Sequence, residues 1–200
     1  VSNSIYAVDF RGSGVTLDTV YIWAAQLEEL SYATSYIPTN GSTVTRDADT
    51  CTGAGEAIDF NSEEGVLYAE IAALANDSQL EGLSLSDGTL NNRVVIFKWS
   101  ASNRIQPRVT SSGSTVFNNG YDVTDITDYN KIALKWKAND FALWVNGTEV
   151  LTDNSGASPT GLNSLQFDSG VGTNTIYSKC KAIRVYKEAL SDTDLQNLTS

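Results

Sequence analysis

Residues 131–147, KIALKWKANDFALWVNG, carry the clearest structural signal in the sequence. Two apolar series alternate with other residues on either side of a short polar break: Ile132, Leu134 and Trp136, and then Phe141, Leu143 and Val145. Side chains two residues apart lie on one face of a β-strand, so each series predicts a half-buried strand. The stretch therefore predicts an antiparallel hairpin, followed by a second tight turn at Asn146-Gly147.

The same period recurs along most of the chain, in short segments that Gly, Asn, Asp and Ser separate. Besides the hairpin, strands are predicted at 57–61, 65–74, 80–86, 92–99, 105–111, 114–117, 162–167 and 176–186. The period changes at 189–198, where Ser191 in the N-cap position and an inward Leu195 predict a short helix. Many short strands with one short helix predict an all-β fold, a two-sheet antiparallel sandwich with a C-terminal helix.

The chain divides into three parts by composition. Residues 1–30 contain two strand-like runs and are predicted to be the terminal strands of a preceding β module. Residues 31–50, with Pro38 and Asn40-Gly41, are predicted to form a linker or an extended edge segment. Residues 51–200 form the main domain. The chain has no Met and opens on Val1 in mid-pattern, so we expect it to be a piece of a longer polypeptide.

Charge excludes some partners. The 24 acidic and 13 basic residues give a formal charge of −11, and such a surface repels phosphate backbones and anionic membranes. No apolar run reaches the length of a transmembrane helix. We therefore expect neither nucleic-acid binding nor membrane insertion. Cys51 and Cys180 are either free thiols or a disulfide pair, and the sequence does not decide between the two.

Two segments resemble one superfamily of β-sandwiches. Residues 181–195, KAIRVYKEALSDTDL, resemble the closing strand and one-turn helix of concanavalin A-like and laminin G-like jelly rolls. The 131–147 hairpin resembles the central hairpin of the same superfamily. Together the two motifs span the body of the chain, roughly 50–200. The resemblance implies a jelly-roll topology for the predicted sandwich.

The N-terminal part of the chain resembles a more narrowly defined group of proteins. YIWAAQLEE at 21–29, SYIPT at 35–39 and TRDAD at 45–49 are similar to a junction found in bacteriophage tail and virion-surface proteins. Ala24 and Leu30 stand where that group usually has Gly. The resemblance implies a virion structural protein, such as a tail fibre, tailspike or head decoration. It also implies a location on the virion surface, other virion proteins as partners, and a homotrimer.

Catalysis is not expected of this chain. Glucanases of the resembled superfamily place carboxylates on one strand with the spacing E-x-D-x-x-E, and the sequence has no such triplet. It also has no His, which removes the commonest general base. The resemblance therefore favours a domain that binds host-surface carbohydrate. The alternatives are a purely architectural domain, or a carbohydrate-binding module of a larger secreted glycan-active enzyme.

Aromatic side chains are the candidates for sugar contact, because sugar C–H faces stack on aromatic rings. The candidate carbohydrate-binding residues are Trp99, Tyr121, Trp144 and Asn146. Trp144 has the opposite parity to Phe141 and Leu143 and is expected to face outward. Core or inter-subunit packing is the alternative role for each of these aromatic residues.

A calcium ion is the one cofactor considered, since relatives of the resembled superfamily often hold one near the glycan-binding edge. The candidate metal ligands are two acidic groups: Asp47 and Asp49, and then Asp122 and Asp125 before the central hairpin. Calcium takes six to eight oxygen ligands. The alternative reading is that these carboxylates cap turns, where Asp is favoured in any case.

Overall fold

The computed structural model describes residues 21, 26–27, 35–45 and 55–200. The chain divides into two compact units, Val1–Arg46 and Asp47–Ser200. In the first unit, Gln26 Oε1 accepts from the backbone N–H of Ile37 at 2.7 Å, and its Nε2 donates to the Ser35 carbonyl at 3.3 Å. The predicted strands of residues 1–30 lie almost wholly outside the described residues, and so does Cys51.

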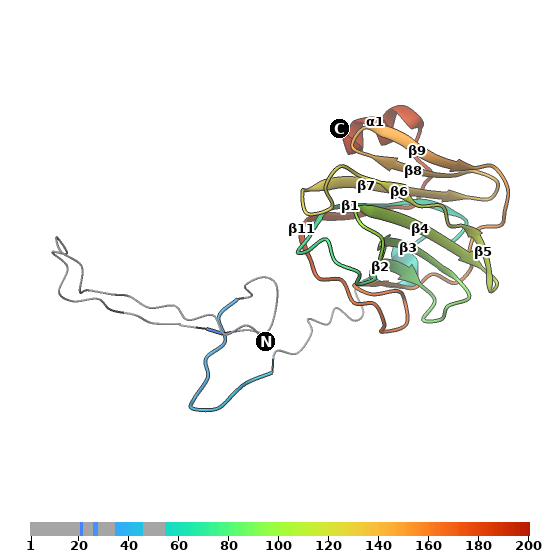
Figure 1. The fold of residues 1–200 in the computed structure, drawn as a ribbon. Helices are drawn as coiled ribbons and strands as arrows, with labels where there is room; N and C mark the ends of the chain where they lie inside the picture. Colours follow the sequence, from blue (N-terminus) through green and yellow to red (C-terminus); the bar gives the residue numbers. More distant parts are fainter. Residues whose placement is uncertain (1–20, 22–25, 28–34, 46–54) are drawn as a thin grey trace. The chain divides into compact units, whose positions relative to one another are not determined.

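The second unit is built from two antiparallel sheets (Figure 1). Sheet B has the strand order β11 (Ser178–Tyr186), β1 (Glu64–Ala73), β7 (Asn130–Lys137), β8 (Phe141–Val145) and β9 (Thr148–Asp153). Sheet A has the order β10 (Ser164–Gln166), β2 (Glu81–Ser86), β3 (Arg93–Lys98), β4 (Arg104–Ser111) and β5 (Ser114–Phe117), with β6 (Tyr121–Asp122) also paired to β4. One helix, α1 (Asp192–Thr199), follows the last strand. The predicted all-β sandwich with a C-terminal helix is confirmed.

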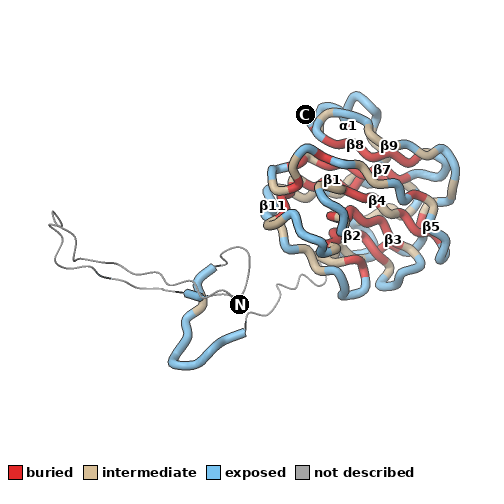
Figure 2. The backbone as a smooth tube through the Cα atoms, in the orientation of Figure 1, coloured by how far each residue is buried: buried red, intermediate tan, exposed pale blue. Residues whose placement is uncertain are grey.

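The hydrophobic core lies between the two sheets (Figure 2). The predicted 131–147 hairpin forms β7 and β8, with Leu134 opposite Leu143 and Ile132 opposite Val145. Both of its apolar series are buried in this core, and Trp136 and Phe141 are among the largest fully buried side chains. The turn after β8 is also as predicted: Asn146 and Gly147 both have positive φ, at 49° and 81°.

On the face of sheet B that is turned away from the core, α1 packs against β7, β8 and β9. A second apolar cluster on this face contains Leu195 of α1 with Val66, Tyr68, Ala133, Ala142 and Trp144. Trp144 has the parity predicted for it, opposite to Phe141 and Leu143. The prediction that it faces outward is wrong, because α1 packs over this face and leaves the residue only 7% exposed.

Both helical segments found in the described part of the chain are short. The strand predicted at 57–61 is wrong: Ala57–Asp59 is a 3-10 helix, in which Asp59 Oδ2 accepts from the Glu56 N–H at 2.8 Å. This local bond competes with strand pairing. The N-cap of α1 is as predicted, since Ser191 Oγ accepts from the Asp194 N–H at 3.2 Å. Among the residues described, no helix is long and apolar enough to cross a membrane.

The packing of α1 gives a stability test. Leu195→Ala removes the fully buried side chain that joins α1 to sheet B, and we expect the free energy of unfolding to fall by about 2–5 kcal/mol. Urea denaturation followed by circular dichroism measures the change. Gln196→Ala on the exposed side of the same helix is the control, expected to change stability by less than about 0.5 kcal/mol. Equal effects of the two substitutions would contradict the packing described.

Candidate functional site

The face of sheet A that is turned away from the core carries polar, basic and aromatic side chains. The strand register places them in three cross-strand rows of β2, β3 and β4: Ser86, Arg93 and Thr110; Ser84, Val95 and Arg108; Gly82, Phe97 and Gln106. Along each strand they alternate with core residues such as Leu85 and Ile96, and therefore lie on the opposite side of the sheet. We call this surface the outer face of sheet A.

The guanidinium of Arg108 lies over two aromatic rings of this face. It is 5.2 Å from the ring centroid of Phe97 and 5.6 Å from that of Trp99. The two rings meet edge to face, with 6.0 Å between their centroids. Arg108 Nε also donates to Asn118 Oδ1 at 3.1 Å. These contacts fix the plane of the guanidinium and leave its terminal N–H groups without a partner among the described residues.

Arg93 lies next to Arg108 and is more deeply buried. It is 7% exposed, and one of its terminal nitrogens donates to the Ser169 carbonyl at 2.7 Å. Burial, and then the neighbouring charge of Arg108, lower the pKa of Arg93, and burial lowers the pKa of Arg108. Arginine remains a cation at neutral pH in proteins, so two positive charges share this part of the outer face.

Neither arginine has a carboxylate partner within the described residues. Most other cations of the domain do have one: Lys98, Arg104, Lys135, Lys137 and Lys181 each lie within 3.0 Å of an Asp or Glu oxygen. In a chain with 24 acidic residues, two adjacent and unneutralised guanidinium groups form a site suited to an anion.

Three buried polar atoms of the same face also lack a hydrogen-bond partner among the described residues. They are Arg93 Nε, Ser84 Oγ and Thr110 Oγ1. Thr110 is directly opposite Arg93 in the register, and Ser84 belongs to the row of Arg108. A buried polar atom without a partner costs about 1–3 kcal/mol, so its presence calls for an explanation. All three atoms are covered by the surrounding protein.

A loop at residues 168–173 borders the outer face on the side of β2. Within the loop, Ser169 N–H donates to the Thr173 carbonyl at 2.8 Å, and Ser86 Oγ donates to the Gly170 carbonyl at 3.0 Å. The loop approaches β2 closely because Gly82 has no side chain: a Cβ there would lie 3.2 Å from the Asp168 backbone. The loop therefore positions the carbonyl that holds Arg93.

The four residues predicted to bind carbohydrate are not brought together. Trp99 lies on the outer face of sheet A beside Arg108. Tyr121 is paired with Ile105 and packs against the core, so it does not share that face. Trp144 is buried under α1, on the other sheet. The Asn146 side chain holds its own turn, accepting from Lys131 N–H and donating to Asn130 Oδ1, both at 2.9 Å.

The residues predicted to bind calcium do not form a group where they are described. Asp122 pairs with Arg104 at 2.6 Å, and this hydrogen bond lowers the pKa of Asp122. Asp125 accepts from the N–H of Thr127 at 2.8 Å and from its hydroxyl, as a turn cap does. Within the described ranges, no three His, Cys, Asp or Glu side chains are placed to hold a metal ion. Asp47 and Asp49 lie outside the described residues, and the calcium prediction stays untested.

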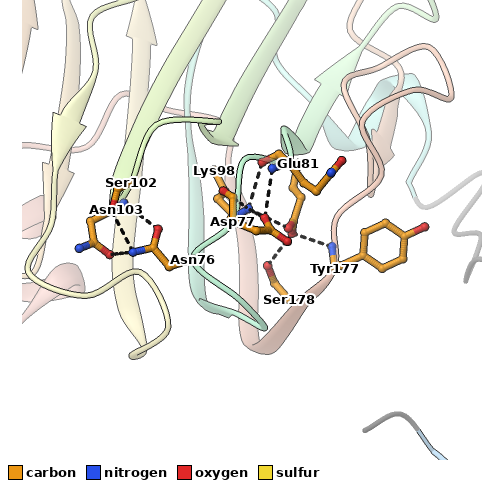
Figure 3. A network of polar contacts seen from close by, with 9 residues as sticks. Asn76, Asp77, Glu81, Lys98, Ser102, Asn103, Tyr177 and Ser178 are labelled. Atoms are coloured by element: carbon orange, nitrogen blue, oxygen red, sulfur yellow. Dashed lines mark hydrogen bonds and ion pairs between the residues drawn. The ribbon is translucent and has the colours of Figure 1, made fainter. Parts of the chain in front are cut away.

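A second polar cluster lies where β2 begins and β3 ends (Figure 3). Lys98 and Glu81 are 6% and 4% exposed, and their charged atoms are 3.2 Å apart. Lys98 also pairs with Asp77 at 2.5 Å, and its hydrogen bond lowers the pKa of Asp77. The second oxygen of Glu81 accepts from Tyr177 N–H at 2.8 Å and from Ser178 Oγ at 3.3 Å. The buried charges are therefore fully paired.

No family model matches the sequence. No curated protein matches it either. Solved structures do resemble the fold. The CBM40 module of the Ruminococcus gnavus IT-sialidase matches with a TM-score of 0.58 at 16% identity, over 76% of this chain and 97% of the module. The same module bound to α2,3 sialyllactose matches with a TM-score of 0.58 at 18% identity, over the same 76% and 97%.

Two further likenesses extend the range of proteins with this fold. The NanB sialidase of Streptococcus pneumoniae matches with a TM-score of 0.58 at 15% identity, over 72% of this chain and 27% of that chain. A SAP-like pentraxin of Limulus polyphemus matches with a TM-score of 0.51 at 13% identity, over 70% of each chain. At such identities the likeness is one of fold, and it confirms the predicted jelly-roll sandwich.

The Lys98–Glu81 pair gives a second stability test. Lys98→Met leaves a buried carboxylate without its cation, and we expect a loss of about 3–5 kcal/mol in the free energy of unfolding. Glu81→Gln added to Lys98→Met removes the stranded charge and should recover much of that loss. Thermal and urea denaturation of both variants measures this.

The matched control for this test is a lysine on the surface. Lys181→Met breaks the Lys181–Glu70 pair, whose charged atoms are 3.0 Å apart and whose lysine is exposed. Exposed pairs contribute about 0–1 kcal/mol, so this variant should unfold close to the unaltered chain. A loss for Lys98→Met no greater than for Lys181→Met would contradict the buried pairing.

Proposed function

We propose that this chain is a carbohydrate-binding module whose outer face of sheet A binds a glycan that carries a carboxylate. One observation supports the proposal above the others. Arg93 and Arg108 lie side by side on this face, and neither has a carboxylate partner within the described residues. Arg93 is 7% exposed and Arg108 is partly exposed, and neither belongs to an ion pair among the described residues.

The groups around the two arginines fit such a ligand chemically. The planar guanidinium forms two parallel hydrogen bonds to the two oxygens of a carboxylate. Arg108 is already oriented by Phe97 and Trp99, so little side-chain freedom is lost when it binds. The half-buried Trp99 offers part of an aromatic surface beside the charged group.

The structural likenesses support the same proposal. A carbohydrate-binding module with this fold is described as bound to α2,3 sialyllactose, and sialic acids carry a carboxylate at neutral pH. The charge of −11 does not oppose it, because the recognition is local and the two arginines are the cations at the site. The proposal assigns no reaction to the chain, in keeping with the lack of a glucanase carboxylate triplet.

Two kinds of parent protein are compatible with the proposed site. The motifs at 21–49 favour a virion component that attaches to a host-surface glycan. The fold likeness to sialidase modules favours a binding module of a larger glycan-active enzyme. A homotrimer belongs to the first setting, and light scattering on the purified chain would test it. The same site would serve both settings.

The site gives a binding prediction. We expect the chain to bind α2,3-sialyllactose in isothermal titration calorimetry and to bind lactose, which has no carboxylate, much more weakly. Arg108→Gln should weaken sialyllactose binding about 10- to 100-fold, because a charge-assisted hydrogen bond contributes about 1.5–3 kcal/mol. Arg93→Gln should have a similar effect, with thermal denaturation to check folding.

Arg184 provides the matched control for this prediction. Its guanidinium also lies over an aromatic ring, 5.5 Å from the Tyr68 centroid, but on the outer face of sheet B. Arg184→Gln removes the same charge from the protein and should leave the affinity unchanged. Equal losses for Arg108→Gln and Arg184→Gln would point to a general charge effect, and equal binding of lactose and sialyllactose would contradict recognition of a carboxylate.

A further inference from the structure

A hollow of about 390 Å³ lies beside the first residues of β2, on the edge of sheet A. Its lining consists of Gln79, Leu80, Glu81, Asn174, Thr175 and Tyr177. This volume lies within the range of sites that hold small molecules, and it accommodates one or two sugar rings. None of the residues discussed for the arginine site lines it.

The lining offers the groups that a neutral sugar needs. The Tyr177 side chain points away from the Lys98–Glu81 pair (Figure 3), and the residue is 48% exposed. The side-chain amides of Gln79 and Asn174 and the hydroxyl of Thr175 have no hydrogen bond to another described residue. An exposed ring with free amide and hydroxyl groups around it can stack on a sugar face and bond to its hydroxyls.

The charge of the hollow selects against an ionic ligand. Glu81 is the sole carboxylate among the lining residues, and its oxygens are engaged by Lys98, by Tyr177 N–H and by Ser178 Oγ. The lining therefore presents no unpaired charge. The same bond from Tyr177 N–H fixes the backbone that carries the exposed ring.

The hollow and the arginine site lie at two ends of one loop. Ser169 accepts from Arg93, and Asn174 lines the hollow. Asn174 is the fifth residue after Ser169, so their Cα atoms are at most about 18 Å apart. Backbone bonds fix both ends, because Ser169 N–H donates to Thr173 and Gly82 N–H donates to Asn174, both at 2.8 Å. A short oligosaccharide covers such a distance.

We infer that the hollow is a second subsite, which binds the neutral sugars joined to the anionic sugar of the same glycan. The inference rests on the proposed function, because the arginine pair supplies the first subsite. Tyr177 stacks against a neutral ring, and Gln79, Asn174 and Thr175 bond to its hydroxyls. The module thus recognises an oligosaccharide and not the terminal acidic sugar alone.

The test compares one ligand that reaches the hollow with one that does not. Calorimetry uses α2,3-sialyllactose and the methyl glycoside of the same sialic acid, with the 200-residue chain. Tyr177→Ala should weaken sialyllactose binding about 3- to 10-fold and leave binding of the methyl glycoside unchanged. Tyr177→Phe keeps the ring and should bind both ligands as the unaltered chain does.

Two further readouts separate this inference from the proposed function. Tyr129→Ala removes another exposed tyrosine ring, which Lys181 covers at 3.9 Å, and should change neither affinity. In saturation-transfer NMR, the lactose protons of sialyllactose should receive saturation from the unaltered chain and lose it with Tyr177→Ala. Unchanged sialyllactose binding by a folded Tyr177→Ala variant would overturn the second subsite and leave the arginine site standing. An unaltered chain that bound neither ligand would overturn the proposed function, and the second subsite with it.

Discussion

The packing of the two inner sheet faces against each other fixes the register of the strands. Ile96 of β3 and Val109 of β4 must both reach the core, and this requirement aligns the two strands so that Val95 lies opposite Arg108 and Arg93 opposite Thr110. A slip of one residue would turn the core side chains to solvent and separate the polar row. The core therefore determines the arrangement of the outer face of sheet A. Residues of this face do not belong to the core, but the core residues next to them in each strand fix their positions.

At this site the domain leaves charged and polar side chains without the partners that similar groups have elsewhere. Lys98, Arg104 and Lys135 each pair with a nearby carboxylate, as expected in an acidic chain. At the outer face of sheet A the pattern is reversed, with two guanidinium groups together and with buried hydroxyls unpartnered. Such groups cost stability, and the guanidinium of Arg108 is held in place by Phe97, Trp99 and Asn118. The jelly roll, joined through a well-packed core and helix, provides the stability that this arrangement requires.

Periodicity alone predicts much of the fold and little of the site. The 131–147 hairpin, the turn at Asn146-Gly147 and the N-cap at Ser191 follow from local pattern and turn chemistry, and all three are present. Trp144 shows the limit of that reasoning: alternation gives the face of a side chain, but not what packs on that face. Arg93 and Arg108 are 15 positions apart in the sequence and become neighbours only through the pairing of β3 with β4. Their alternation with core residues is the signal that the sequence offers, and what sets them apart from Arg184 in space is that two guanidinium groups lie together without a nearby carboxylate among the described residues.

The location of two cations in a strongly acidic protein has a kinetic consequence. With a formal charge of −11, the molecule as a whole repels an anionic glycan over about one Debye length, roughly 30 Å at 10 mM salt, and the arginines attract it only at close range. Added salt therefore raises both the association and the dissociation rate, and the two changes have opposite effects on the affinity. It weakens the long-range repulsion and speeds association, and it weakens the contact between guanidinium and carboxylate and shortens the lifetime of the complex. If the chain has the proposed function, both effects favour rapid exchange between neighbouring glycans at physiological ionic strength, a property that suits movement across a densely glycosylated surface.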